Sequence, residues 1–76
     1  PEFADVYYHL GQAFGAKNLL GQAYQNFGYY YKIMGDPQTA LLHFQKAQQY
    51  FPPQSAEVQQ INKEIQELSA AKKKTP

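Results

Sequence analysis

Few side chains in this sequence have the types and spacing that acid–base, metal or nucleophilic chemistry requires. There are two histidines, His9 and His43, and the helical patterns described below place them on different helices. The His-Glu-x-x-His pattern of zinc peptidases, in which two histidines one helical turn apart hold the metal, does not occur. We expect both histidines to be packing or surface residues, and we expect no catalytic residue, metal ligand or cofactor in this chain.

Nucleophile and phosphate-binding patterns are missing as well. Neither Ser55 nor Ser69 stands in a nucleophile motif, and the glycines are too isolated to form a phosphate loop. Lys72-Lys73-Lys74 is the one basic run, and its simplest interpretation is a solvated helix end rather than a phosphate or lipid contact. With a formal net charge of +1, the chain gives no electrostatic argument for nucleic acid as a partner.

Composition describes one small domain rich in aromatic side chains. The 76 residues include 7 Tyr and 5 Phe but no cysteine, so disulfides are excluded and the compartment is left open. No stretch approaches the roughly 18 apolar residues that span a bilayer, so we expect no membrane insertion. Residues 1–3 resemble the end of a common fusion-vector linker, and we expect the natural chain to begin near Ala4.

The chain is organised around a helical hairpin. Aromatic and small residues recur along it at the spacing of single helix faces: Tyr24, Phe27, Gly28 and Tyr31, then Ala40, Phe44 and Ala47. These stripes predict helices over 20–34 and 37–51. Between them, Gly35 suits a left-handed helix end, Asp36 a helix cap and Pro37 the first helical position.

A helix upstream, over 4–16, carries the same spacing. Its apolar and small residues at this spacing are Tyr7, Leu10, Gly11 and Phe14. Each stands 17 positions before its counterpart in the hairpin, as Tyr7 does before Tyr24. We expect this face to pack against the helix over 20–34. Gly11 is expected to stay small because another helix or a bulky ring must come close there.

Three consecutive tyrosines lie in the helix over 20–34. Successive helical residues point about 100° apart, so the three cannot share one face. We expect Tyr31 to lie in the core, Tyr30 to face the first helix, and Tyr29 to lie on the open surface.

A fourth helix is predicted to begin after the capping residue Ser55, and we assign it residues 54–70. Its apolar residues form one narrow stripe: Val58, Ile61, Ile65 and Leu68. Because its other faces are polar, this helix suits the terminal cap of a helical stack. Residues 71–76 are expected to be a disordered basic tail.

These motifs resemble the tetratricopeptide repeat, a helical hairpin of about 34 residues. The positions that match its signature are Tyr7, Leu10, Gly11, Phe14, Ala23, Tyr24, Phe27, Gly28, Tyr31, Ala40, Phe44, Ala47 and Pro52. The upstream copy departs from the family at Tyr30, which replaces a small alanine, and at Gly35, which replaces a proline. Because the offset between copies is half the repeat, residues 4–52 contain about two overlapping repeats built from three helices.

The resemblance implies an all-α fold of antiparallel helical hairpins in a right-handed stack with a C-terminal capping helix. It also implies a concave groove, whose residues here are Tyr8, Gln12, Gln22, Gln25, Tyr29 and Lys32. Chaperone-binding members grip a C-terminal carboxylate with a Lys and an Asn one turn apart, but the matching pairs here are Tyr8 with Gln12 and Gln25 with Tyr29. The groove therefore suits a neutral peptide or protein surface. Alternatively, Tyr8 and Tyr29 only cover the open edge of a short stack.

A second resemblance is to the C-terminal repeats of bacterial M48-type zinc peptidases, and it is carried by residues 7–15, 26–32 and 35–47. It implies that a zinc-binding catalytic domain precedes the repeats on the periplasmic side, and that the repeats dock a partner or substrate. We therefore expect a non-catalytic protein–protein interaction module. The alternative is a structural repeat fragment that homodimerises through an exposed aromatic edge or packs on a preceding domain of the parent.

Overall fold

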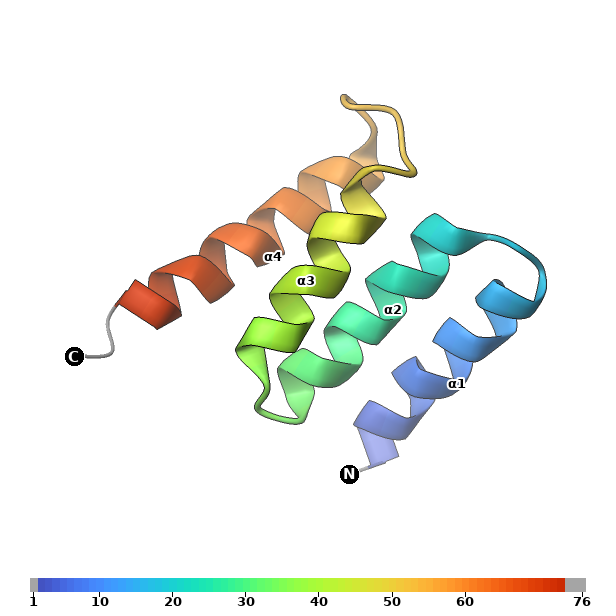
Figure 1. Ribbon diagram of the computed structural model, residues 1–76, viewed down its shortest axis with the longest axis horizontal. Helices are drawn as coiled ribbons and strands as arrows, with labels where there is room; N and C mark the ends of the chain where they lie inside the picture. The colour runs from blue at the N-terminus through green and yellow to red at the C-terminus, as the bar shows by residue number, and fades with distance from the viewer. Residues whose placement is uncertain (1, 74–76) are drawn as a thin grey trace.

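The computed structural model describes residues 2–73, which form four helices and confirm the expected all-α fold. The helices are α1 (Glu2–Ala16), α2 (Leu20–Ile33), α3 (Pro37–Gln48) and α4 (Ala56–Lys73). Each helix packs against the next one in the chain and runs antiparallel to it (Figure 1). The four helices make a thin slab with principal extents of 41 × 32 × 15 Å. None of these described helices has the length and apolar content that crossing a membrane would need.

The turn between α2 and α3 has the geometry expected from its residues. Gly35 has a φ of +80°, a left-handed conformation that costs glycine little. The Asp36 carboxylate accepts a hydrogen bond from the Thr39 backbone N–H at 3.2 Å, and Pro37 opens α3. This side-chain bond satisfies one of the free N–H groups at the start of the helix.

The other two connections use the same kind of turn chemistry. Asn18, with a φ of 61°, lies in the left-handed conformation between α1 and α2. Ser55 accepts a hydrogen bond from the Val58 N–H through its Oγ at 3.1 Å, which confirms it as the cap of α4.

Two phenylalanine rings lie directly on glycines of the preceding helix. A Cβ atom added at Gly11 would stand 2.8 Å from the Phe27 ring, and one added at Gly28 would stand 2.7 Å from the Phe44 ring. Real Cβ atoms do not approach so closely, so the helices can lie at this separation only with glycine at both positions. The same contact thus joins α1 to α2 and α2 to α3.

The buried core lies between α3 and its two neighbours. Ala40, Phe44 and Ala47 of α3 are fully buried, as is Ile61 of α4. The small alanines let the adjoining helices approach, and the Phe44 ring fills the space beside Gly28. Tyr24 and Tyr31 of α2 pack against this cluster while remaining half-buried.

The third helix is shorter than predicted. It ends at Gln48 rather than at residue 51, because the next two residues form a tighter turn. Gln49 and Tyr50 donate their N–H groups to carbonyls three residues back, at 3.2 and 3.0 Å. Pro52 therefore lies in an exposed loop instead of stopping the helix directly.

The fourth helix is longer than predicted. It continues to Lys73, so residues 71–73 of the expected disordered tail are helical. Residues 74–76 and Pro1 lie outside the described residues, and so does the rest of that prediction.

Leu10 departs from its predicted place in the core, with 40% of its surface exposed. It stands 17 positions before Phe27 and 34 before Phe44. Each of those rings covers a glycine of the preceding helix, and no described helix precedes α1. Leu10 therefore has no equivalent glycine to pack on. Tyr7 and Phe14, on the same helix, are half-buried as a core-facing stripe requires.

Candidate interaction surface

The six residues expected to line one groove do not form one surface. Tyr8, Gln12 and Lys32 are exposed, while Gln22, Gln25 and Tyr29 are half-buried. Tyr8 packs on Tyr30 and Tyr29 packs on Tyr7, with ring centroids 5.1 and 5.2 Å apart. Because Tyr29 and Tyr30 point about 100° apart on α2, these two contacts belong to different faces of the molecule.

Tyr29 does not lie on the open surface, which corrects the expectation from the tyrosine row. Its ring stands edge-on to the buried Phe44 ring at 5.2 Å, besides its contact with Tyr7. Burial raises the pKa of the Tyr29 hydroxyl, against the opposing effect of a hydrogen bond with Gln25. The periodicity of one helix could not reveal this, because α2 packs against neighbours on both sides.

Lys32 links the same side of α2 to α4. Its Nζ lies 2.5 Å from a carboxylate oxygen of Glu64 and 3.5 Å from one of Glu67. The hydrogen bond to Glu64 is the main reason that the pKa of Lys32 is raised. Glu64 is only 7% exposed, so the pair holds a nearly buried carboxylate. Lys32 thus helps to position α4.

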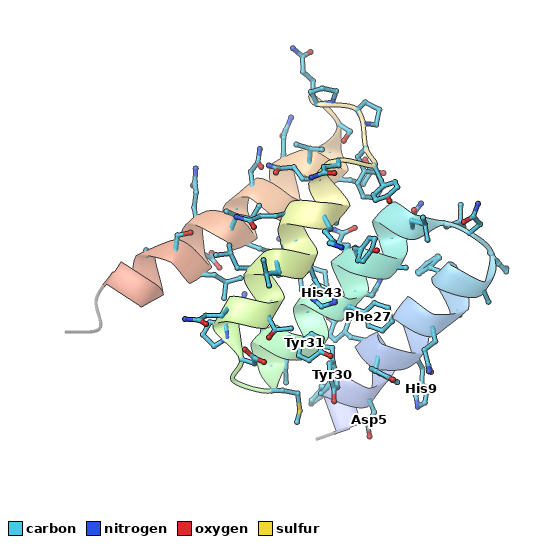
Figure 2. The ribbon with its side chains drawn as sticks, viewed as in Figure 1. Asp5, His9, Phe27, Tyr30, Tyr31 and His43 are labelled. Carbon is cyan, nitrogen blue, oxygen red and sulfur yellow. The ribbon has the colours of Figure 1, made fainter. Side chains whose placement is uncertain are left out.

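A different surface, which we call the aromatic face, runs across α1, α2 and α3. It consists of Tyr8, Phe27, Tyr30, Tyr31 and His43. Ring centroids follow one another at 5.1 Å from Tyr8 to Tyr30, 5.0 Å to Tyr31 and 5.0 Å to His43. Figure 2 shows the labelled members from α2 and α3 lying together on the side toward the viewer. These rings form a curved row from Tyr8 to His43 that spans three helices, and Phe27 closes it, with its centroid 5.6 Å from that of Tyr8 and 6.0 Å from that of His43.

His43 is held in place at the α3 end of this row. Its Nδ1 lies 2.9 Å from the Thr39 carbonyl oxygen, which can only accept, so Nδ1 carries the proton in this bond. Its ring stacks on Tyr31 with 29° between the planes. His43 is thus half-buried and packed against its neighbours, one of the two environments expected for it.

The α3 end of the row continues into an exposed rim. The Tyr24 ring lies 6.0 Å from the His43 ring and stacks on Tyr50 at 5.8 Å. Lys46 places its ammonium group 5.5 Å from the centre of the Tyr24 ring, within the range of a cation–π contact. Tyr50 is 52% exposed, so this end of the row is open to a partner.

The α1 end of the row carries two polar residues that differ in charge. Asp5 and His9 lie one helical turn apart beside Tyr8, and Figure 2 shows both at the edge of the labelled group. Both are exposed, and the described ion pairs do not include Asp5. The sequence prediction did not single out Asp5, although its position one turn before His9 is visible in the sequence.

These side chains offer packing and hydrogen bonding. Within the described residues, no group of three His, Asp or Glu side chains could hold a metal ion. The described buried side-chain polar atoms all have hydrogen-bond partners, so none is aimed unpaired into a cavity. Half-exposed tyrosines combine a large apolar surface with a polar tip, which is typical of contact surfaces between proteins.

No family model, curated protein or solved structure matches this chain. The chemistry of the aromatic face is therefore what indicates a function.

Proposed function

We propose that this chain is a non-catalytic protein-interaction module that docks a peptide or a partner protein on the aromatic face. The observation that carries the proposal is the unbroken row of rings from Tyr8 to His43, which a folded core does not need to expose. The tyrosines lose little side-chain entropy on binding, because each has only two rotatable side-chain bonds.

Site-specific photo-crosslinking tests this role. A photoreactive amino acid at Gln12, one turn from Tyr8 and exposed, should crosslink saturably to a defined partner protein in the source cells. The control position is Gln66, which is also an exposed glutamine but lies on α4, away from the aromatic face. Crosslinking at Gln12 alone supports the proposal. Equal crosslinking at both positions, or none at either, contradicts it.

For the parent protein, we propose the C-terminal repeat region of an M48-type zinc peptidase, with a periplasmic location. The support is the resemblance of residues 7–15, 26–32 and 35–47, together with a fold of packed helical hairpins. In such a parent, this region would dock the substrate or an assembly partner and contribute none of the catalytic residues. The natural reading frame upstream of Ala4 tests this, because it should encode His-Glu-x-x-His and a secretory signal. A reading frame that lacks the His-Glu-x-x-His motif and the secretory signal would contradict both the peptidase parent and the periplasmic location.

Homodimerisation is the second candidate function, and a specific observation favours it. The outer stripe of α1 exposes Val6 and Leu10 by 55% and 40%, and Phe3, one of the three residues expected to come from a vector, continues the stripe with 79% exposed. These residues follow the 3,4 spacing of one helix face, so they form a short apolar strip with no described neighbour. A second copy could cover the strip, and the mass in solution distinguishes this from docking alone.

A further inference from the structure

We propose that α4 is an internal competitor for a second docking site, the apolar face of α3 that it covers. When α4 moves away, this face receives an amphipathic helix of a partner protein, which brings a carboxylate to Lys32. The site is separate from the aromatic face, so the inference does not rest on the docking function proposed above. Three features carry it: the polar joint that holds α4, the short exposed connection before α4 and the chemistry of the face beneath it (Figure 1).

The joint that holds α4 differs from the two earlier joints. Each of those seats a phenylalanine ring on a glycine of the preceding helix, but α3 contains no glycine. Instead, Lys32 of α2 pairs with Glu64 and Glu67 of α4, and the side-chain amide of Gln48 donates a hydrogen bond to Asn62. The side chains of Lys32 and Glu67 are 38% and 52% exposed, and an ion pair open to water contributes little to stability. Elements held by such contacts open locally before the core does, so α4 is the helix most easily released.

The connection before α4 allows this helix to move as a unit. The Phe51 ring lies on Gly21, where an added Cβ would stand 2.8 Å from it, so the chain is fixed to α2 up to this residue. Residues 52–54 follow and are exposed, and Ser55 then caps α4 with its own side chain. Because α4 takes its cap with it, rotation within residues 52–54 releases an intact helix while α1, α2 and α3 keep their contacts.

The contacts of α4 show what kind of helix can replace it. Ile61 and Leu68, two helical turns apart, lie in one apolar cluster with the buried Phe44 of α3. Glu64 stands between them in the sequence and pairs with Lys32. When α4 leaves, Lys32 loses this carboxylate, and its ammonium group attracts an acidic residue of an incoming helix. The partner is therefore a helix with an apolar stripe and an acidic residue within it, as α4 itself has.

Fluorescence anisotropy with a labelled peptide of residues 55–70 tests the inference on the full chain. The peptide carries the stripe and the carboxylates of α4, and it can bind only the fraction of molecules in which α4 has moved away. We expect saturable binding. Glu64→Gln in the chain should tighten it about two- to fivefold, because this change weakens the internal competitor by one ion pair and leaves Lys32 free for the peptide.

Three matched changes separate competition from a general loosening of the fold. Glu64→Gln in the peptide should weaken binding to the unchanged chain about two- to fivefold, because Lys32 then receives no carboxylate. Lys32→Gln in the chain should leave the affinity nearly unchanged, since it removes the ion pair of α4 and that of the peptide together. Lys63→Gln, which changes one charge at an exposed neighbour of Glu64, should also leave it unchanged. Circular dichroism checks that every variant folds.

Hydrogen exchange of the unchanged chain tests the opening itself. The backbone amides of α4 should exchange faster than those of α2 and α3, because α4 opens while the other helices stay packed. Equal protection of the three helices would overturn the inference, since α4 would then leave only when the whole chain unfolds.

The binding results decide between the remaining possibilities. Absence of peptide binding to the Glu64→Gln chain overturns the docking site. Equal tightening by Lys32→Gln and Glu64→Gln overturns the acidic partner, because loosening alone would then explain the binding. A dimer whose mass persists in Leu10→Lys overturns the partner protein and assigns the face to α4 of a second copy. None of these results bears on the aromatic face, which the crosslinking at Gln12 tests separately.

Discussion

At the scale of single residues, the helices are held at their separation by rings that lie on glycines. Phe44 is fully buried and its ring lies where a Cβ of Gly28 would have to be, at 2.7 Å. A fully buried ring has no free space to move into, so even one added carbon must shift the helices. Gly15 is different, because the nearest atom to its added Cβ is 3.9 Å away, on Ala23.

Gly28→Ala should therefore destabilise the fold by about 1–3 kcal/mol, the usual cost of overpacking a core. Gly15→Ala is the matched control and should stabilise it by up to about 1 kcal/mol, because alanine favours the helix and finds room. Urea unfolding followed by circular dichroism measures both. A Gly28→Ala protein as stable as the wild type would show that α2 and α3 do not approach as closely as described.

Tyr29 allows a second test at the residue scale. Its ring packs between Tyr7 and Phe44, and we expect Tyr29→Ala to destabilise by about 1–3 kcal/mol, less than the about 3–5 kcal/mol of a fully buried aromatic. Tyr50→Ala, which removes a ring that is 52% exposed, should cost clearly less. Thermal melts of the two variants give the comparison. Equal melting temperatures for the two variants would indicate that Tyr29 lies on the open surface.

The sequence predicts residues well where one neighbour decides their environment. Gly11 was expected to lie under a bulky group, and the Phe27 ring is that group. Tyr29 was misplaced because helical periodicity describes one face, whereas α2 has neighbours on both sides. The Lys32–Glu64 pair was not predicted, because the two residues stand 32 positions apart and no local pattern connects them.

At the scale of elements, the start of α3 depends on a charged cap. Hydrogen bonding by Thr39, through its side chain first and its backbone N–H second, lowers the pKa of the Asp36 carboxyl below its ordinary value of 3.8. A lowered pKa means that the folded state releases the proton more readily than the unfolded state. The stabilisation is thus fully present above pH 3.8 and is lost as the pH falls through the folded pKa.

Asp36→Asn should remove this part of the pH dependence while keeping a capping side chain. We expect the difference in free energy of unfolding between wild type and Asp36→Asn to be constant from about pH 5 upward. Under more acidic conditions, the wild type should lose stability relative to the variant. Asp5→Asn serves as the control, because Asp5 is exposed and caps no helix. Unfolding curves between pH 2 and pH 6 measure this difference. If the free energies of unfolding of wild type and Asp36→Asn change in parallel with pH, the Asp36 cap is not the cause of the pH dependence.

The element boundaries show which local signals are sufficient. The junction of α2 and α3 was predictable to within a residue, because Gly35, Asp36 and Pro37 each favour one position there. The end of α3 was not, since a helix can unwind into a tighter turn several residues before a proline. The aromatic face was not predictable either, because it is assembled from three helices whose relative rotation no single helix specifies.

At the scale of the whole molecule, the slab has two unlike edges. The α4 edge is closed, because Ile61 and Leu68 are buried and the Lys32–Glu64 pair ties the helix down. The α1 edge is open, since Leu10 occupies the position that Phe27 and Phe44 hold in the later helices. A second copy could pack on the α1 edge, because each copy offers the same edge.

The mass in solution tests whether that edge pairs. We expect sedimentation equilibrium to give the monomer mass of 8.7 kDa at low concentration and a rising mass at high concentration. The association should be weak, because three exposed side chains bury far less than the about 800 Å² per partner of a standard interface. Leu10→Lys should abolish the rise, whereas Leu42→Lys, at a leucine that is 61% exposed on α3, should preserve it. A mass of 8.7 kDa at every concentration would exclude the homodimer and leave docking on the aromatic face as the function to pursue.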